Sequence, residues 1–328
     1  MPGNFSKIFY SDNGSTATEV SIKMALQFWN NKDQFSRNKI LAFNHSYHGD
    51  TFGAMSASSR SIFTKAFDEK LFEVIFIDTP SEENIGKIQL QIEKYKNEIA
   101  CFIYEPLLQG AGGMLMYESK YLNELLSFLK NEKIICIADE VLTGFYRTGK
   151  FFASEYMLNK PDIICLSKGL TGGTMALGVT ACTQKIYDAF VSDDKTKTFF
   201  HGHSFTANPL ACTAALASLE LFANKKSLAR IEKIINRNEK FIKNLHSKKY
   251  KNEIKNIRHL GTIIAFEIVT SQGDKYLNNI TEVFTKFCLS EGVYLRSLGN
   301  TIYVMPPYCI TKKQLKKVFE TIEKFLDL

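Results

Sequence analysis

Short apolar runs alternate along the chain with longer amphipathic stretches. Several of the runs contain no polar residue, which is typical of strands that are covered on both faces of a parallel sheet. The strands predicted in this way are Ile40–Phe43, Val74–Ile77, Cys101–Tyr104, Ile134–Ala138, Ile163–Leu166 and Val179–Thr183. The helices predicted between them are Thr16–Trp29, Gln89–Asn97, Lys120–Asn131 and Asn208–Ala223. The alternation predicts an α/β fold with a mainly parallel sheet.

The pattern changes after about residue 223. The elements predicted beyond it are a Lys- and Asn-rich helix over Ser227–His246, a strand over Gly261–Val269, a helix over Ile280–Glu291, a strand over Thr301–Met305 and a final helix from near Thr311. Helices and strands in this mixed order are typical of an α+β domain. We therefore expect a large domain over residues 1–223 and a smaller one over residues 224–328.

The composition is that of an ordinary globular protein, with 45% hydrophobic and 23% charged residues in 328. The net charge of +7 comes without a basic stripe interleaved with aromatic residues, so we expect no nucleic-acid partner. The seven cysteines stand singly, without a CxxC pair, which favours a reducing cytoplasm. No apolar stretch approaches the ~18 residues of a membrane span, so we expect no membrane anchor.

A lysine ends one of the apolar runs. Lys168 follows Ile163–Leu166 and Ser167, and glycines follow it at 169, 172 and 173. Desolvation at such a strand end lowers the pKa of an amine and makes it a nucleophile toward carbonyl groups. Taken alone, the same pattern also fits a lysine whose ammonium extends into solvent.

A carboxylate ends the preceding apolar run, Ile134–Ala138. Asp139 at this position could keep the nitrogen of a pyridine ring protonated, as an electron-withdrawing cofactor requires. The alternative is an aspartate that caps the next turn. Because the strand with Asp139 and the strand with Lys168 follow each other closely, the pair favours a cofactor site.

A glycine and small hydroxyl residues precede the first predicted helix. In the segment Ser11–Thr16, Gly14 and Ser15 lie where the N–H groups of a helix start could bind a phosphate, assisted by the helix dipole. The alternative is an ordinary helix N-cap with a turn glycine. Neither GxGxxG nor GxxxxGK[ST] occurs there, which argues against a nucleotide-binding loop.

An aromatic residue and two histidines follow the strand Ile40–Phe43. Tyr47 is the candidate for stacking on a flat cofactor. His45 and His48, like His201 and His203, lack cysteine or carboxylate companions at metal-ligand spacing. We therefore expect no metal site.

Together these segments resemble the class III pyridoxal-5′-phosphate (PLP)-dependent aminotransferases, which have fold type I. The similar stretches are FYSDNGSTATEVSIKMALQFW, YHGDTFGAMS, EPLLQGAGGM, IADEVLTGFYRTGKFFA, PDIICLSKGLTGGTM, HGHSFTANPLAC and IYVMPPY, which lie between Phe9 and Tyr308. Within that class, QGAGGM, KGLTGGTM and MPPY are most similar to the subfamily that transfers an amino group from S-adenosylmethionine to 8-amino-7-oxononanoate in biotin biosynthesis.

The resemblance implies PLP as cofactor and a homodimer with active sites at its interface. It implies that Lys168 binds PLP covalently and then moves a proton during transamination. It also implies that Asp139 contacts the pyridine nitrogen and that Tyr47 stacks on the ring. The phosphate would be bound by Gly14 and Ser15 together with His203 and Ser204 of the partner subunit. The residues implied to contact the substrates are Tyr47, Arg147, Gly202 and Arg296. Arg296 would bind the substrate carboxylate, and Asp50 and Glu105 would orient other groups.

Two features depart from the family pattern. Tyr146 stands where the family usually has glycine in its F-G-R-T-G turn. The chain also starts almost at the phosphate motif, whereas family members carry an N-terminal segment before it, so we expect a chain truncated relative to the family. Two alternatives therefore stay open: a class III aminotransferase acting on ornithine, acetylornithine or an ω-amino acid, and a PLP-binding paralogue without turnover.

Overall fold

The chain divides into two compact units. The computed structural model describes residues 1–246, 250, 252–270 and 279–328. The first unit contains Met1–Phe145 and Lys150–Glu220, and the second contains Tyr146–Gly149 and Leu221–Leu328. Four residues from the middle of the chain therefore belong to the second unit, so a cut at a single point does not separate the two.

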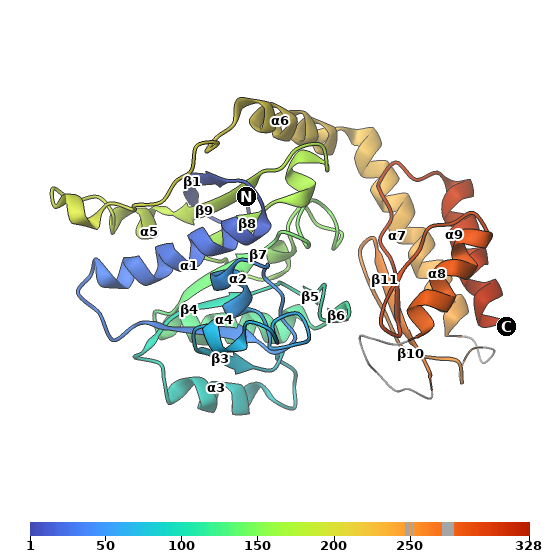
Figure 1. The fold of residues 1–328 in the computed structure, drawn as a ribbon, viewed down its shortest axis with the longest axis horizontal. Helices are drawn as coiled ribbons and strands as arrows, with labels where there is room; N and C mark the ends of the chain where they lie inside the picture. Colours follow the sequence, from blue (N-terminus) through green and yellow to red (C-terminus); the bar gives the residue numbers. More distant parts are fainter. Residues whose placement is uncertain (247–249, 251, 271–278) are drawn as a thin grey trace. The chain divides into compact units, whose positions relative to one another are not determined.

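A twisted sheet forms the centre of the first unit (Figure 1). Its described residues make seven strands in the order β1-β9-β8-β7-β4-β2-β3. The strands are β1 (Phe5–Ser11), β2 (Lys39–Phe43), β3 (Val74–Ile77), β4 (Ile99–Tyr104), β7 (Ile135–Asp139), β8 (Ile163–Leu166) and β9 (Gly178–Thr183). Strands β3, β2, β4, β7 and β8 are parallel, while β9 runs antiparallel to both β8 and β1.

Because β9 is antiparallel to both of its neighbours, β1 and β8 are parallel to each other. Strand β1 therefore runs the same way as β8 and the other parallel strands, and all their carboxyl ends lie at one edge of the sheet. In open α/β sheets this edge is where ligands bind. A small hairpin of β5 (Leu108–Gln109) and β6 (Leu115–Met116) follows β4.

The first unit also contains helices α1 (Gly14–Asn30), α2 (Phe52–Ala57), α3 (Ile85–Glu93), α4 (Ser119–Asn131), α5 (Gln184–Asp188) and α6 (Pro209–Ala223), except that the end of α6 from Leu221 belongs to the second unit. Helix α1 packs on the sheet through Val20, Met24 and Phe28, which recur every fourth residue and are buried. The indole N–H of Trp29 donates to the carbonyl of Ala100 in β4 at 2.8 Å. This bond attaches the end of α1 to a central strand, which fixes the start of the helix relative to the sheet edge.

The described residues of the second unit form an antiparallel sheet and three helices. Its sheet has the order β10-β11-β13-β12. The elements are α7 (Lys225–Leu245), β10 (Ile254–Leu260), β11 (Ile263–Ile268), α8 (Ile280–Ser290), β12 (Ser297–Leu298), β13 (Thr301–Val304) and α9 (Lys312–Leu326). Its core includes stacked rings of Phe241 and Phe319, with centroids 4.1 Å apart. No helix of the described ranges is long and apolar enough to cross a membrane.

The predicted fold class is confirmed. The short elements α2, α5, β5, β6 and β12 were not predicted, and three longer elements also differ from the prediction. Helix α3 lies four residues earlier than predicted because Ile88 and Ile92 are its buried residues and the chain turns from Tyr95 onward. Strands β1 and β10 were not predicted, since each is an edge strand with exposed polar residues and therefore lacks a continuous apolar run.

Candidate active site

Six strands of the described sheet end at the same edge, and candidate residues lie at or just after the ends of four of them. Gly14 and Ser15 follow β1, Tyr47 follows β2, Asp139 ends β7 and Lys168 follows β8. The chain thus brings together residues that are up to 154 positions apart. The roles that the sequence suggests for them stay predictions.

The start of α1 has N–H groups available to an anion. The Asn13 side chain accepts from the N–H of Thr16 at 3.0 Å, which forms a capping box. No described residue accepts from the N–H groups of Gly14 and Ser15. A Cβ atom on Gly14 would lie 2.8 Å from the Val141 side chain, so the helix start approaches the loop after β7 more closely than another residue allows.

The candidate ring-binding carboxylate is buried and held by a histidine. Asp139 Oδ2 lies 2.8 Å from Nδ1 of His48, and Oδ1 accepts from the N–H of Val141 at 3.1 Å. The side chains of His48 and Asp139 are 0% and 6% exposed. With its proton on Nδ1, the imidazole donates to the carboxylate and fixes its orientation. Nε2 of His48 is buried without a partner among the described residues.

Sequence reasoning considered His48 only as a metal ligand and missed this pairing. The signal that could have found it is its place one residue after Tyr47, at the same sheet edge as Asp139. No group of three or more His, Cys, Asp or Glu side chains in the described ranges could hold a metal ion. The geometry therefore gives His48 a different partner from the one that the sequence raised.

A buried glutamate supports the loop that carries Tyr47. Glu105 follows β4, and its carboxylate accepts from the N–H of Tyr47 at 3.1 Å and from the N–H of Gly110 at 3.0 Å. Burial raises the pKa of Glu105 to about 7. Burial and the bond from its hydroxyl to Asp50, at 2.8 Å, raise the pKa of the Tyr47 phenol. The N–H of Asp50 donates to Ser15 Oγ, which connects this loop to the start of α1.

The backbone at Lys168 is unusual. Lys168 has φ of +46°, in the left-handed region that costs energy for residues other than glycine. Its neighbours hold this conformation: Ser167 Oγ donates to the carbonyl of Leu177 at 2.7 Å, and Ser218 Oγ donates to the carbonyl of Gly169 at 3.0 Å. The side chain of Lys168 is exposed at the sheet edge. A strained, well-supported backbone of this kind is typical of functional positions.

The segment with the remaining phosphate candidates lies near the start of α1 in its own chain. His203 Nδ1 is 3.5 Å from an Asp12 carboxylate oxygen, while Gly202 and Ser204 are exposed. His201 stacks on Phe199 and lies 2.8 Å from the Lys23 ammonium. The reach of His203 and Ser204 into a partner subunit stays a prediction.

The two candidate substrate arginines lie in the second unit. Arg147 donates to the carbonyl of Pro306 at 2.7 Å, and its guanidinium lies 4.5 Å from the centre of the Tyr308 ring. Arg296 is exposed, and its Nε lies 3.2 Å from the Tyr303 hydroxyl. The Arg147 guanidinium is thus held by its own unit, which fixes the orientation that it could offer a substrate.

Comparisons with known proteins identify the family. A family model described as "Aminotransferase class-III" matches residues 1–326. The chain belongs to the class III aminotransferases. It is therefore a transaminase-family enzyme, and PLP is the cofactor that this family implies.

The chain is similar to adenosylmethionine-8-amino-7-oxononanoate aminotransferases from several organisms. It is 41% identical to the one from Synechococcus elongatus, covering 100% of this chain and 78% of the relative. It is 37% identical to the one from Staphylococcus aureus, covering 98% and 75%. The crystal structure of the enzyme with this name from Methanocaldococcus jannaschii superposes with a TM-score of 0.91 at 34% identity, covering 99% of this chain and 76% of that one.

Proposed function

We propose that the chain transfers the amino group of S-adenosylmethionine to the ketone of 8-amino-7-oxononanoate, which gives 7,8-diaminononanoate. The names of the relatives support these substrates, at 41% and 37% identity. The observation that carries the proposal is the buried pair of Asp139 and His48 at the sheet edge where Lys168 and the α1 start also lie.

The residues at the sheet edge fit PLP. The N–H groups of Gly14 and Ser15 lack a described acceptor, as a phosphate site requires. A carboxylate that accepts two hydrogen bonds at Asp139 suits a protonated ring nitrogen. Tyr47 would stack on the ring, and the Lys168 amine would attach the cofactor covalently.

When bound, PLP supplies an electron-withdrawing ring and carries the amino group from donor to acceptor. The side chains of this chain would do the remaining work. Lys168 would move a proton between the substrate carbon that bears the amino group and C4′ of the cofactor, in one direction for the donor and in the other for the acceptor. Asp139, held by His48, would keep the proton on the ring nitrogen. Arg296 would bind the substrate carboxylate, with Arg147 and Gly202 as further contacts.

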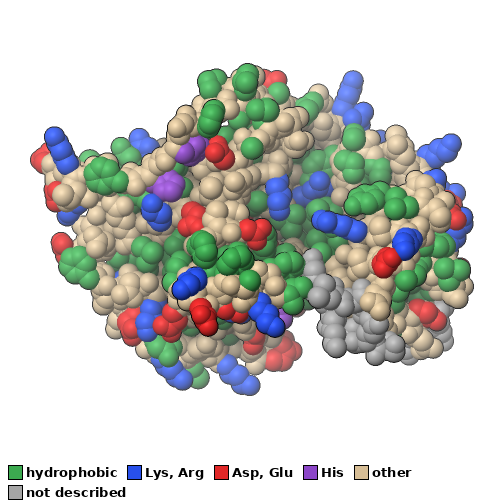
Figure 2. All heavy atoms as spheres, viewed as in Figure 1, with side chains coloured by type: hydrophobic (Ala, Val, Ile, Leu, Met, Phe, Trp, Pro, Cys, Tyr) green, Lys and Arg blue, Asp and Glu red, His purple; other side chains and the backbone are tan. Residues whose placement is uncertain are grey.

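We also propose that the chain forms a homodimer in the cytoplasm. Helix α6 buries Ala211, Ala215 and Ser218 and exposes Leu210 and Leu216 at 71% and 62%. Figure 2 shows hydrophobic side chains over this helix. An exposed apolar helix face of this kind is typical of a protein interface. In the dimer, His203 and Ser204 of one copy would contribute to the phosphate site of the other.

The test is a donor and acceptor screen with the purified protein. We expect 7,8-diaminononanoate from S-adenosylmethionine and 8-amino-7-oxononanoate, and no product when either is omitted. Lys168→Ala should remove both turnover and the near-visible absorbance of bound PLP. Activity with ornithine and 2-oxoglutarate but none with S-adenosylmethionine would contradict the proposed donor. Bound PLP without a half-reaction toward any amine would contradict turnover itself.

A further inference from the structure

The first unit contains a cavity away from the candidate active site. It lies at the ends of β1 and β9 where Lys7 pairs with Cys182, whereas the active-site end of these strands is where Ser11 pairs with Gly178. Its volume is about 320 Å³, at the lower limit of small-molecule sites. No residue that we assign to PLP or to the amino substrates lines it.

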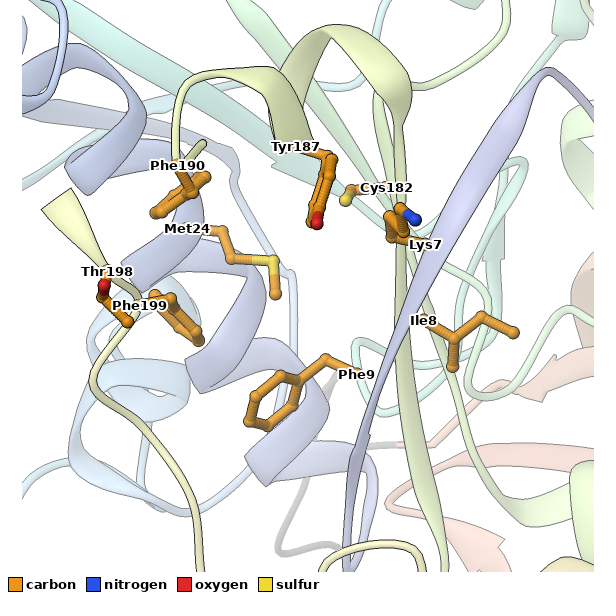
Figure 3. Close-up of a pocket in the computed structure, with 9 residues that line it drawn as sticks. All are labelled: Lys7, Ile8, Phe9, Met24, Cys182, Tyr187, Phe190, Thr198 and Phe199. Carbon is orange, nitrogen blue, oxygen red and sulfur yellow. The ribbon is translucent and has the colours of Figure 1, made fainter. Parts of the chain in front are cut away.

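The lining of this cavity is mainly apolar. Figure 3 shows the Met24 thioether pointing into the space between aromatic rings. The rings belong to Phe9, Tyr187, Phe190 and Phe199. At ~30 Å³ for a water-sized group, the cavity has room for about ten such groups, which corresponds to the ten heavy atoms of an eight-carbon carboxylate.

One charged group lies at this cavity. The Lys7 ammonium is 4.5 Å from the centre of the Tyr187 ring, so the ring holds the charge beside the apolar space. Lys7 is exposed and forms no ion pair with a carboxylate in the described ranges. The cavity therefore offers a positive charge without a counterion next to an apolar lining.

We propose that this cavity binds an unbranched monocarboxylate of about eight carbons, with its carboxylate at Lys7 and its chain among the rings. A neutral chain would leave the ammonium without a counterion, and an alkylammonium would be repelled by it. A dicarboxylate would bury a second charge against apolar rings. The proposal is independent of the substrates proposed above.

Calorimetric titration of the purified full-length protein, with its cofactor bound, tests the proposal. The probes are octanoate, hexanoate, octan-1-ol and octylamine. We expect saturable binding of octanoate, weaker binding of octan-1-ol and none of octylamine. Hexanoate should bind about fifteenfold more weakly than octanoate, because each buried methylene adds about fourfold in affinity.

Two variants and a matched control locate the binding. Lys7→Met should weaken octanoate by about tenfold and leave octan-1-ol unchanged, since it removes the charge and keeps the length of the side chain. Lys32→Met is the control, because Lys32 also lies over a ring, that of Phe28 at 5.0 Å, but does not line the cavity. Thr198→Trp, at an exposed position on the cavity, should abolish binding of both ligands.

Three results would overturn the proposal. The first is no saturable binding of octanoate at millimolar concentration. The second is equal octanoate affinity in Lys7→Met and Lys32→Met. The third is a change of oligomeric state in Thr198→Trp by sedimentation, which would assign this face to an interface between copies of the chain.

Discussion

Glu105 gives the most quantitative prediction, because its carboxyl group is buried beneath the Tyr47 loop and its pKa is raised from 4.5 to about 7. In the unfolded chain the group ionises near 4.5, whereas in the folded chain it stays protonated up to about pH 7. The folded state is therefore favoured by this group below pH 4.5, and the advantage is lost as the pH rises through 7. The full difference corresponds to ~3 kcal/mol, of which roughly 2 kcal/mol is lost between pH 5 and 7.5.

Glu105→Gln isolates this effect. Glutamine cannot ionise, and its NH2 group cannot accept a hydrogen bond, whereas the two oxygens of the Glu105 carboxyl group accept from the N–H groups of Tyr47 and Gly110. The variant should therefore be less stable than the parent at pH 5, by ~1–3 kcal/mol for the lost acceptor. That difference should shrink by roughly 2 kcal/mol as the pH is raised to 7.5.

Urea unfolding of the cofactor-free protein measures this difference, at one protein concentration and at several pH values from 5 to 7.5. Glu124→Gln, an exposed position on α4, is the matched control and should follow the parent at every pH. If the free energies of unfolding of Glu105→Gln and the parent change in parallel over this range, burial does not raise the pKa of Glu105 and the reasoning fails.

Three other substitutions have clear expected outcomes. Gly261→Ala should lower the free energy of unfolding by about 3 kcal/mol in a urea titration, because its φ is +58° and a Cβ would lie 2.2 Å from a main-chain carbon. Gly86→Ala is the control: this position in α3 has open space around it, so the substitution should raise the free energy of unfolding by ~0.5 kcal/mol. Equal effects of the two substitutions would refute the steric argument. His48→Phe should lower the free energy of unfolding by ~1–3 kcal/mol, because it leaves an Asp139 oxygen without its donor. It should also weaken the affinity for PLP in an absorbance titration, and an unchanged affinity would refute the role of the pair. Gly14→Ala should weaken PLP about tenfold by displacing the first turn of α1, and an unaltered affinity would refute the phosphate site.

The sequence predicted the central sheet well where burial is complete. The segment Ile163–Leu166 matches the fully buried β8 residue for residue, because a strand between two helical layers needs apolar side chains on both faces. Val74–Ile77 also matches β3, an edge strand that is only partly buried but has no polar residue. Strand β1 has one face and one edge toward solvent, so Ser6 and Lys7 interrupt its apolar pattern. Its pairing with β9 depends on chain reversals that local periodicity does not encode.

The sequence could predict only those residues of the candidate site that lie at the ends of predicted strands. Tyr47, Asp139 and Lys168 each follow an apolar run, and parallel strands carry their ends to one edge. The contact between His48 and Asp139 joins residues 91 positions apart and depends on how the loops after β2 and β7 fold back. The hydrogen bond that holds the Arg147 guanidinium similarly depends on a segment 159 residues later in the chain.

The four residues Tyr146–Gly149 have a consequence for how this protein can be rearranged. The carbonyl of Arg147 accepts from the N–H of Thr262, so the turn is tied to the strand pair β10–β11. A chimaera in which the region after residue 223 came from a relative would combine the relative's β10–β11 hairpin with this chain's own turn. Functional chimaeras should therefore require the turn to be exchanged together with the C-terminal region. During synthesis, more than a hundred further residues must be added after the turn before its hydrogen-bond partner is present.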